Sequence, residues 1–182
     1  MTITRIDHDA ALIVIDMQQG ILRFNSDAAD RIVQATASMA QRFHETGRPV
    51  VWLHAQGLPD VRTDAGLGAS AEMPEEAMIL DPHLPVAEGD LDIRKRATSA
   101  FTVESLESWL RARGVTQVVI TGLATGMGVL STAFSAYDRG FHVVIPADAT
   151  TDMNAARGKA VLNDILPAIA EVGTSEDVLR LA

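Results

Sequence analysis

The sequence contains no cysteine among its 182 residues. Disulfides, thiolate zinc sites and a cysteine nucleophile are therefore excluded on chemical grounds. Basic residues are few: the chain has 15 Lys and Arg and 24 Asp and Glu, which gives a formal net charge of −9. The basic residues form no run that would neutralise the phosphates of a nucleic acid. No apolar run reaches the roughly 18 residues that span a bilayer, and the first residues lack a signal-peptide pattern. We therefore expect a cytoplasmic protein that binds neither nucleic acid nor membrane.

The rest of the composition is that of an ordinary globular domain. Apolar residues make up 47% of the chain and charged residues 21%, although aromatic residues reach only 4%. These fractions argue against disorder, a coiled coil and a collagen-like repeat. Because 182 residues is close to the usual length of one domain, we expect residues 1–182 to fold as a single domain.

Apolar strands and amphipathic helices alternate along the chain. Continuous apolar runs predict strands at residues 10–15, 49–55, 118–121 and 142–146, with a shorter strand at 92–96. Helical spacing predicts helices at residues 26–45, 102–113, 126–139 and 153–165. Ser26 or Asp27 is placed to cap the first helix and Asp152 the last. This alternation predicts an α/β fold, a three-layer α/β/α, doubly wound, Rossmann-like sandwich around a mostly parallel sheet of six strands.

Residues 57–90 interrupt this alternation. The segment holds Pro59, Pro74, Pro82 and Pro85 and shows little apolar periodicity, so we expect a long loop. Loops of this length in a compact domain often serve as lids or oligomer contacts, and a surface excursion without a role is about as common. Both interpretations remain open.

Two charged residues lie where a doubly wound sheet binds its ligands. Asp16 ends the first strand behind an apolar run, so its carboxyl can have the raised pKa that suits proton transfer. It could equally cap a turn. Lys95 lies in a short basic strand and can pair with a buried carboxylate, although a solvated basic edge is the alternative.

A third feature is the glycine-rich segment 121–129, Thr-Gly-Leu-Ala-Thr-Gly-Met-Gly-Val, which joins a strand to a helix. Such a junction can direct backbone amides at an oxyanion or carboxylate. It is also an ordinary way to pack a helix closely against a strand. Neither the dinucleotide-binding spacing nor the phosphate-loop spacing is present.

Together, these three features resemble the isochorismatase-like hydrolases, also called the cysteine hydrolase superfamily. The apolar strand followed by Asp16-Met17-Gln18 is similar to the family's first motif, whose Asp is the catalytic acid or base. Lys95 precedes Ser99-Ala100-Phe101 as the family's catalytic lysine precedes a similar triplet. The segment from Gly122 through Ala133 resembles the nucleophile region, and the family often has a cis peptide where Ala124-Thr125 falls.

The sequence departs from the commoner family pattern at one position. The family's nucleophilic cysteine would fall at Gly128, which places the chain in the subgroup that has glycine there. Without a thiol, attack on an amide to form a thioester cannot follow the usual route. Thr125 and Ser131 are conceivable substitutes, but each would need a positioned base.

True isochorismatases resemble this chain in having Gly at the cysteine position, and their chemistry needs no nucleophile. The resemblance implies a hydrolase that cleaves a vinyl ether or related bond in a small carboxylate substrate, with Asp16 as the general acid. Lys95 would bind a substrate carboxylate or modulate Asp16, and the amides of residues 126–128 would hold an oxyanion or carboxylate. The alternative is a degenerate amidohydrolase that serves as a small-molecule binding or interaction module.

The resemblance also implies further contacts with substrate. Proposed substrate-binding residues are Phe24, Trp52, Gln56, Phe101, Ala124, Thr125, Gly126 and Met127. No cofactor is implied. No metal is implied either, because the metal-binding nicotinamidases share an Asp-x-His at the end of the second strand, and here Trp52 stands two residues before His54. Family members usually assemble, so we expect a homo-oligomer, a dimer or larger.

Overall fold

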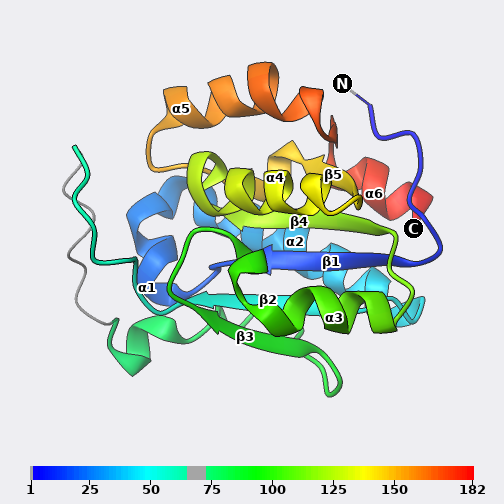
Figure 1. The fold of residues 1–182 in the computed structure, drawn as a ribbon, viewed down its shortest axis with the longest axis horizontal. Helices are drawn as coiled ribbons and strands as arrows, with labels where there is room; N and C mark the ends of the chain where they lie inside the picture. The colour runs from blue at the N-terminus through cyan, green and yellow to red at the C-terminus, as the bar shows by residue number, and fades with distance from the viewer. Residues whose placement is uncertain (1, 65–72) are drawn as a thin grey trace.

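The computed structural model describes residues 2–64 and 73–182, and its core is a single parallel sheet (Figure 1). The strands follow the order β3-β2-β1-β4-β5-β7, while β6 pairs with β4 off this path. All pairings between these strands are parallel. The strands are β1 (Ala10–Ile15), β2 (Val50–Ala55), β3 (Leu91–Lys95), β4 (Gln117–Leu123), β5 (His142–Pro146), β6 (Thr150–Thr151) and β7 (Glu171–Gly173).

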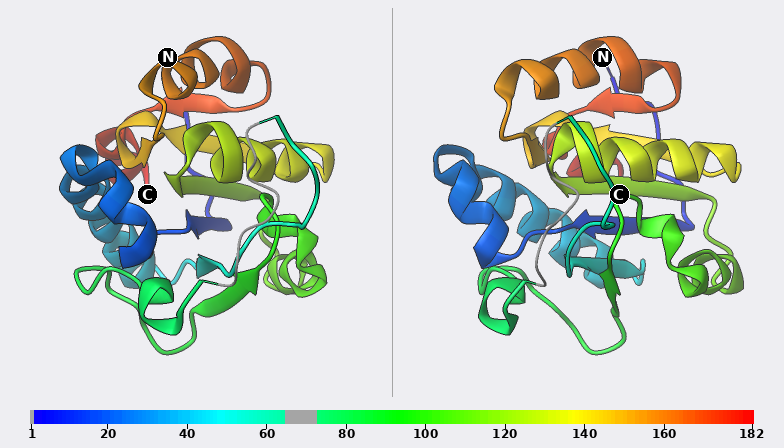
Figure 2. Two further views of the ribbon diagram at one scale, coloured as in Figure 1. Left: turned by 90° about the vertical axis from the view of Figure 1, so that its left-hand side faces the viewer. Right: turned by 60° about the vertical axis from the view of Figure 1, so that its left-hand side comes forward.

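Helices cover both faces of the sheet, as Figure 2 shows. They are α1 (Gln19–Leu22), α2 (Ser26–Glu45), α3 (Glu104–Ala112), α4 (Leu130–Asp138), α5 (Ala155–Ala160) and α6 (Ser175–Leu181). Alternate residues of β1 divide the core, because successive side chains of a strand point to opposite faces. Ile13 packs in the cluster that includes side chains of α3 and α4, whereas Leu12 packs in the cluster that includes those of α2 and α6. The predicted three-layer α/β fold is confirmed.

The structure corrects several predicted boundaries. The sheet has seven strands where six were expected, and its two shortest strands, β6 with two residues and β7 with three, give no apolar run. The helix expected at 126–139 begins with a π-helical turn at Thr125–Val129, and the one expected at 153–165 ends in another at Val161–Ile165. The helix expected at 102–113 is shorter, because a 3₁₀ turn at Ala100–Thr102 precedes α3.

The predicted helix caps are also different in the structure. Asn25 precedes α2 and makes no side-chain cap. Asn154 caps α5 by accepting a hydrogen bond from the Arg157 amide, whereas Asp152, the expected cap, accepts hydrogen bonds elsewhere. The cis peptide bond joins Leu123 to Ala124, one bond earlier than the resemblance indicated.

The long segment 57–90 is only partly described. Residues 57–64 and 73–90 contain one 3₁₀ helix, Glu75–Met78, and an isolated antiparallel bridge between Gln18 and Leu80. This bridge and the hydrogen bond from the Gln19 amide to Ile79 O tie the segment to the residues that follow β1. Part of the predicted loop, residues 65–72, lies outside the described residues.

Candidate active site

The candidate site lies where the strand order reverses. From β1 the chain proceeds through β2 to β3 on one side, and β4 then pairs with the other side of β1. The crevice beyond the carboxyl ends of two such strands is the usual ligand site of a doubly wound fold. Asp16 follows β1 and Ala124 follows β4, so both residues lie at this crevice.

Close packing between β1 and β4 holds this end of the sheet together. Gly122 pairs with Ile15 and has a φ of +110°. A Cβ on Gly122 would lie 2.0 Å from the carbonyl oxygen of Ile15, so only glycine fits this close approach. Asp16, the residue that follows β1, is in the left-handed region with a φ of +53°. Its amide donates to Leu53 O at 3.1 Å, which fixes the turn against β2.

The structure brings Asp16 and Lys95 together. Lys95 Nζ donates to Asp16 Oδ2 at 2.7 Å and to Ala97 O at 3.2 Å. The side chains are 1% and 10% exposed for Lys95 and Asp16, so water screens their interaction little. Lys95 ends β3, and the carboxylate follows β1, two strands away in the sheet. Three neighbouring strands therefore position this ion pair.

Burial and the ammonium group act in opposite directions on the Asp16 carboxyl. Burial disfavours the carboxylate and raises the pKa of Asp16, while Lys95 lowers it through its charge and hydrogen bond; the net pKa is raised. Asp16 Oδ1 is buried and has no hydrogen-bond partner among the described residues. A carboxyl with a raised pKa and an unpartnered oxygen can carry a proton for transfer.

Gly128 faces this carboxyl. A Cβ built on Gly128 would lie 3.5 Å from Asp16 Oδ2 and 2.8 Å from Ile15 Cγ2. A side chain at position 128 would therefore point toward the acid, as the family's cysteine is expected to do. In this chain the Ile15 methyl occupies part of that space, so the surroundings are packed around glycine.

A cavity of about 390 Å³ opens in front of these residues. Asp16, Lys95 and Gly128 all line it, and most of its other lining is apolar. Three predicted substrate-binding residues also line it: Phe24, Ala124 and Met127. Phe24 is 63% exposed, which leaves its ring free to contact a ligand.

The other predicted substrate-binding residues do not line this cavity. Trp52 is fully buried in the core beneath α2, where Nε1 donates to Asp90 Oδ2 at 2.8 Å, and Phe101 packs against Phe141 in the opposite core. Gln56 is half-buried between the lining residues Ala55 and Gly57.

The backbone amides that were expected to bind an anion also differ from the prediction. Thr125 is buried, and its hydroxyl donates to Thr150 Oγ1 at 3.2 Å. The Gly126 amide donates to Asp152 Oδ2 at 2.7 Å, and the Met127 amide to Ala124 O at 3.0 Å. These two amides already have protein acceptors, so they are not available to an anion in this arrangement.

Several residues at the site had been assigned no role there from the sequence. Arg23 and Arg157 line the cavity, and Asp152 lies directly behind Arg157. Gln18 joins β1 to β2 because its side-chain amide donates to Ala55 O and accepts from Ala55 N. The family resemblance included Gln18, whereas Arg157 lies on a short helix and no local pattern indicates where it points.

The described residues offer no obvious metal site. No group of three or more His, Asp or Glu in residues 2–64 and 73–182 is arranged to hold a metal ion. His54 Nδ1 lies 2.9 Å from Met78 O, and Nε2 lies 3.1 Å from Asp92 Oδ2. Both ring nitrogens of His54 therefore have protein partners. Of the helices in the described ranges, none is long and apolar enough to cross a membrane.

Comparison with known proteins places this site in a family. The Isochorismatase domain matches residues 10–177, and the chain belongs to the isochorismatase family of hydrolases. It is 34% identical over 179 residues to YecD, an uncharacterized isochorismatase family protein of Escherichia coli O157:H7, covering 93% of this chain and 94% of that protein. It is 32% identical over 164 residues to a streptothricin hydrolase of Streptomyces noursei, covering 87% of this chain and 60% of that protein.

A solved structure has nearly the same fold. An isochorismatase family protein from Burkholderia thailandensis superimposes with a TM-score of 0.89 at 31% sequence identity. The match covers 99% of this chain and 98% of that one. The family resemblance that the sequence indicated is therefore confirmed, whereas the assignment to a subgroup with glycine in place of cysteine remains a prediction.

Proposed function

We propose that this protein is a hydrolase of the glycine-for-cysteine subgroup, which cleaves an enol ether in a small carboxylate substrate by acid catalysis. The observation that carries the proposal is the position of Gly128. An acid with a raised pKa faces a residue without a side chain at the place where the family's nucleophile would stand. Acid-catalysed cleavage of a vinyl ether requires the acid and not the nucleophile.

The two hydroxyls that could replace the thiol support the proposal by their positions. Ser131 Oγ donates to Gly128 O at 3.3 Å, and Thr125 Oγ1 donates to Thr150 Oγ1 at 3.2 Å. Neither residue lines the cavity, and neither hydroxyl donates to a base among the residues that the structure describes. A serine or threonine nucleophile needs such a base.

In the proposed reaction, Asp16 transfers its proton to the terminal carbon of the enol ether, forming the C–H bond and leaving an oxocarbenium ion. Water adds to the cationic carbon and returns a proton to the Asp16 carboxylate. The resulting hemiketal separates into a ketone and an alcohol, so the net reactant is one water molecule. Lys95 stabilises the Asp16 carboxylate during the interval in which it lacks the proton, because its ammonium lies 2.7 Å from Oδ2.

The apolar lining of the cavity fits the same reaction. Phe24, Met127 and Leu123 would contact the hydrocarbon part of a small substrate and limit the number of water molecules near the cation. Gly128 lines the cavity beside Asp16 and presents only backbone to the enol group.

The reaction class can be tested with two substrates of different bond type. The wild-type protein is incubated separately with isochorismate, which has an enol ether, and with ureidoacrylate, which has an amide-type bond. Products are identified by mass spectrometry. Release of pyruvate from isochorismate alone supports the proposal. Turnover of the amide-type substrate alone overturns it, and turnover of neither favours the alternative of a binding module.

A further inference from the structure

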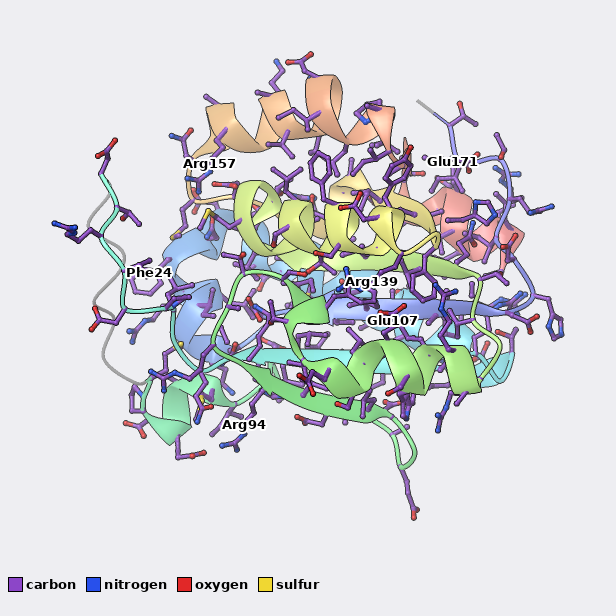
Figure 3. The ribbon with its side chains drawn as sticks, in the orientation of Figure 1. Phe24, Arg94, Glu107, Arg139, Arg157 and Glu171 are labelled. Carbon is purple, nitrogen blue, oxygen red and sulfur yellow. The ribbon has the colours of Figure 1, made fainter. Side chains whose placement is uncertain are left out.

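Arg157 is a charged cavity residue that neither the family motifs nor the proposed acid chemistry uses. It lies on α5 and lines the cavity together with Asp16 and Gly128. Figure 3 shows Arg157 and Phe24 at the same end of the molecule. Its side chain is 39% exposed, so part of the guanidinium can reach a ligand.

The Asp152 carboxylate fixes the position of this guanidinium. Arg157 Nη2 donates to Asp152 Oδ1 at 2.6 Å, and Nε lies 3.1 Å and 3.2 Å from the two carboxylate oxygens. The amides of Asn154 and Gly126 donate to the same carboxylate at 2.8 Å and 2.7 Å. The carboxylate side chain of Asp152 is completely buried. Because several hydrogen bonds converge on it, Asp152 is a rigid support for Arg157.

Two glycines make room for this arrangement. A Cβ on Gly126 would lie 2.8 Å from Arg157 Cγ and Cδ, and a Cβ on Gly158 would lie 2.9 Å from Asp152 Cβ. The guanidinium therefore packs directly over the turn that carries Gly128. A side chain at either position would push the ion pair away from the cavity wall.

One edge of Arg157 remains available. Nε and Nη2 face Asp152, whereas Nη1 makes no hydrogen bond within residues 2–64 and 73–182. Arg23, the other arginine of the lining, forms no ion pair with a described residue and stacks on the Phe24 ring at 4.9 Å. Asp16 is the only carboxylate among the described lining residues, and Lys95 already neutralises it.

Lys95 is paired with Asp16, and Arg157 with Asp152. Arg23 is therefore the lining cation that adds a positive charge without an ion pair among the described residues, in a protein whose net charge is −9. A local cationic site attracts anions even when the whole chain is acidic, because low-dielectric walls focus the nearby field. The arginines are separate from the Asp16 and Lys95 pair, so they can bind one part of a ligand while the acid acts on another.

We propose that Arg157, held by Asp152, binds a carboxylate of the substrate and thereby determines that this hydrolase accepts anions rather than neutral analogues. This inference rests on the proposed function, which supplies the reaction, but it concerns only which ligands the cavity binds. The anchored carboxylate would lie over the turn at Gly126, with the apolar part of the substrate extending toward Asp16. Arg157 is the specificity-determining residue, and Asp152 is a positioning residue.

The test compares a carboxylate with its neutral counterpart. Binding of 4-fluorobenzoate and of 4-fluorobenzamide to the wild-type protein and its variants is measured by ¹⁹F NMR titration. We expect the wild type to prefer the carboxylate. Arg157→Gln is expected to weaken carboxylate binding by about 10- to 100-fold, the usual effect of losing a charged hydrogen bond, while amide binding changes little. Arg157→Lys, which keeps the charge but not the planar fork, is expected to give an intermediate loss.

Three further variants separate this inference from others. Arg113→Gln removes a positive charge from the surface where Arg113 stacks on Trp109, outside the cavity, and is expected to leave the carboxylate preference unchanged. Asp16→Asn is expected to lower turnover by orders of magnitude yet keep the preference, so failure of the proposed reaction and failure of this inference can be told apart. Asp152→Asn is expected to reduce the ratio of carboxylate to amide affinity, which loss of packing alone would not do.

The inference is overturned if the wild type shows no preference for 4-fluorobenzoate, including no binding up to the solubility of the probe. It is also overturned if Arg157→Gln and Arg157→Lys, folded by circular dichroism, retain the full preference. Equal loss of carboxylate and amide binding in both Arg157 variants would indicate a role in packing and would contradict it as well.

Discussion

The Lys95 ammonium lies 2.7 Å from Asp16 Oδ2, and both side chains are almost completely buried. Asp16 Oδ1, the other carboxylate oxygen, is buried and has no hydrogen-bond partner among the described residues. The pair therefore neutralises charge without satisfying the whole carboxyl group. Burial raises the pKa of Asp16 more than Lys95 lowers it, which prepares the carboxyl to donate a proton.

The stability of the fold should depend on the two partners jointly. Lys95→Met leaves a buried carboxyl without its ammonium, and Asp16→Asn leaves a buried ammonium without its carboxylate. Breaking a buried pair in this way typically costs about 3–5 kcal/mol. We expect the double variant Asp16→Asn with Lys95→Met to lose less than the sum of the single losses, as measured by urea unfolding at neutral pH. Additive losses would show that the pair is not coupled.

The activity of the proposed acid should fall as the pH rises. Asp16 must be protonated to act, and its pKa is raised above the ordinary value, so kcat/KM should decrease through that raised pKa. Lys95 lowers this pKa, and Lys95→Met should therefore move the decrease to higher pH. A pH–rate profile of both proteins measures the shift. A shift to lower pH would contradict the assignment.

The same raised pKa has a consequence for stability. Between the ordinary pKa of Asp16 and its raised value, the folded state keeps a proton that the unfolded state releases. The contribution of this group to the free energy of unfolding is therefore present at low pH and lost as the pH rises through that window. Comparing unfolding of the wild type and Asp16→Asn across pH isolates this contribution. The difference between them should change with pH in this direction only.

A side chain at position 128 should disturb the packing of Ile15. The Cβ of Gly128→Ala would lie 2.8 Å from Ile15 Cγ2, an overlap that we expect to lower the free energy of unfolding by about 1–3 kcal/mol. In an Ile15→Ala background the same substitution should have a smaller effect, because the interfering methyl is gone. Thermal or urea unfolding of the four proteins provides the comparison. Equal effects in both backgrounds would mean that Ile15 does not set the requirement for glycine.

Phe24 should contribute to substrate binding and little to folding. It is 63% exposed and lines the cavity. Phe24→Ala removes apolar contact with the substrate worth about 1–2 kcal/mol, so we expect KM to rise about 5- to 30-fold. The free energy of unfolding should not change. Phe134→Ala is a matched control, since Phe134 on α4 is 41% exposed and lies outside the cavity lining. An equal rise of KM in both variants would contradict a specific role for Phe24.

The middle of the sheet could be predicted from sequence because β1, β2, β4 and β5 contain continuous apolar runs. Residues 142–146 and the helix at 26–45 have the predicted bounds. β6 and β7 were missed because two- and three-residue strands are too short to show a pattern, and their pairing depends on tertiary neighbours.

A site residue could be predicted only where its position in the sequence determines its position in the fold. Asp16 and Lys95 end strands of one parallel sheet, so both had to lie at its carboxyl edge. Trp52 was expected at the cavity, but side chains alternate along β2 and residue 52 points into the core beneath α2. The Gly126 amide was expected to face a ligand, but Asp152, 26 residues further along the chain, accepts its hydrogen bond.

The most direct test of the proposed mechanism is pyruvate release from isochorismate, coupled to lactate dehydrogenase, by wild type and Asp16→Asn matched for folding by circular dichroism. Proton transfer from Asp16 to carbon predicts that Asp16→Asn lowers kcat by about 10²- to 10⁴-fold. It also predicts that the wild-type reaction slows in deuterium oxide. Undiminished pyruvate release by Asp16→Asn, or no pyruvate release by the wild type, would contradict Asp16 as the acid of an enol-ether hydrolase.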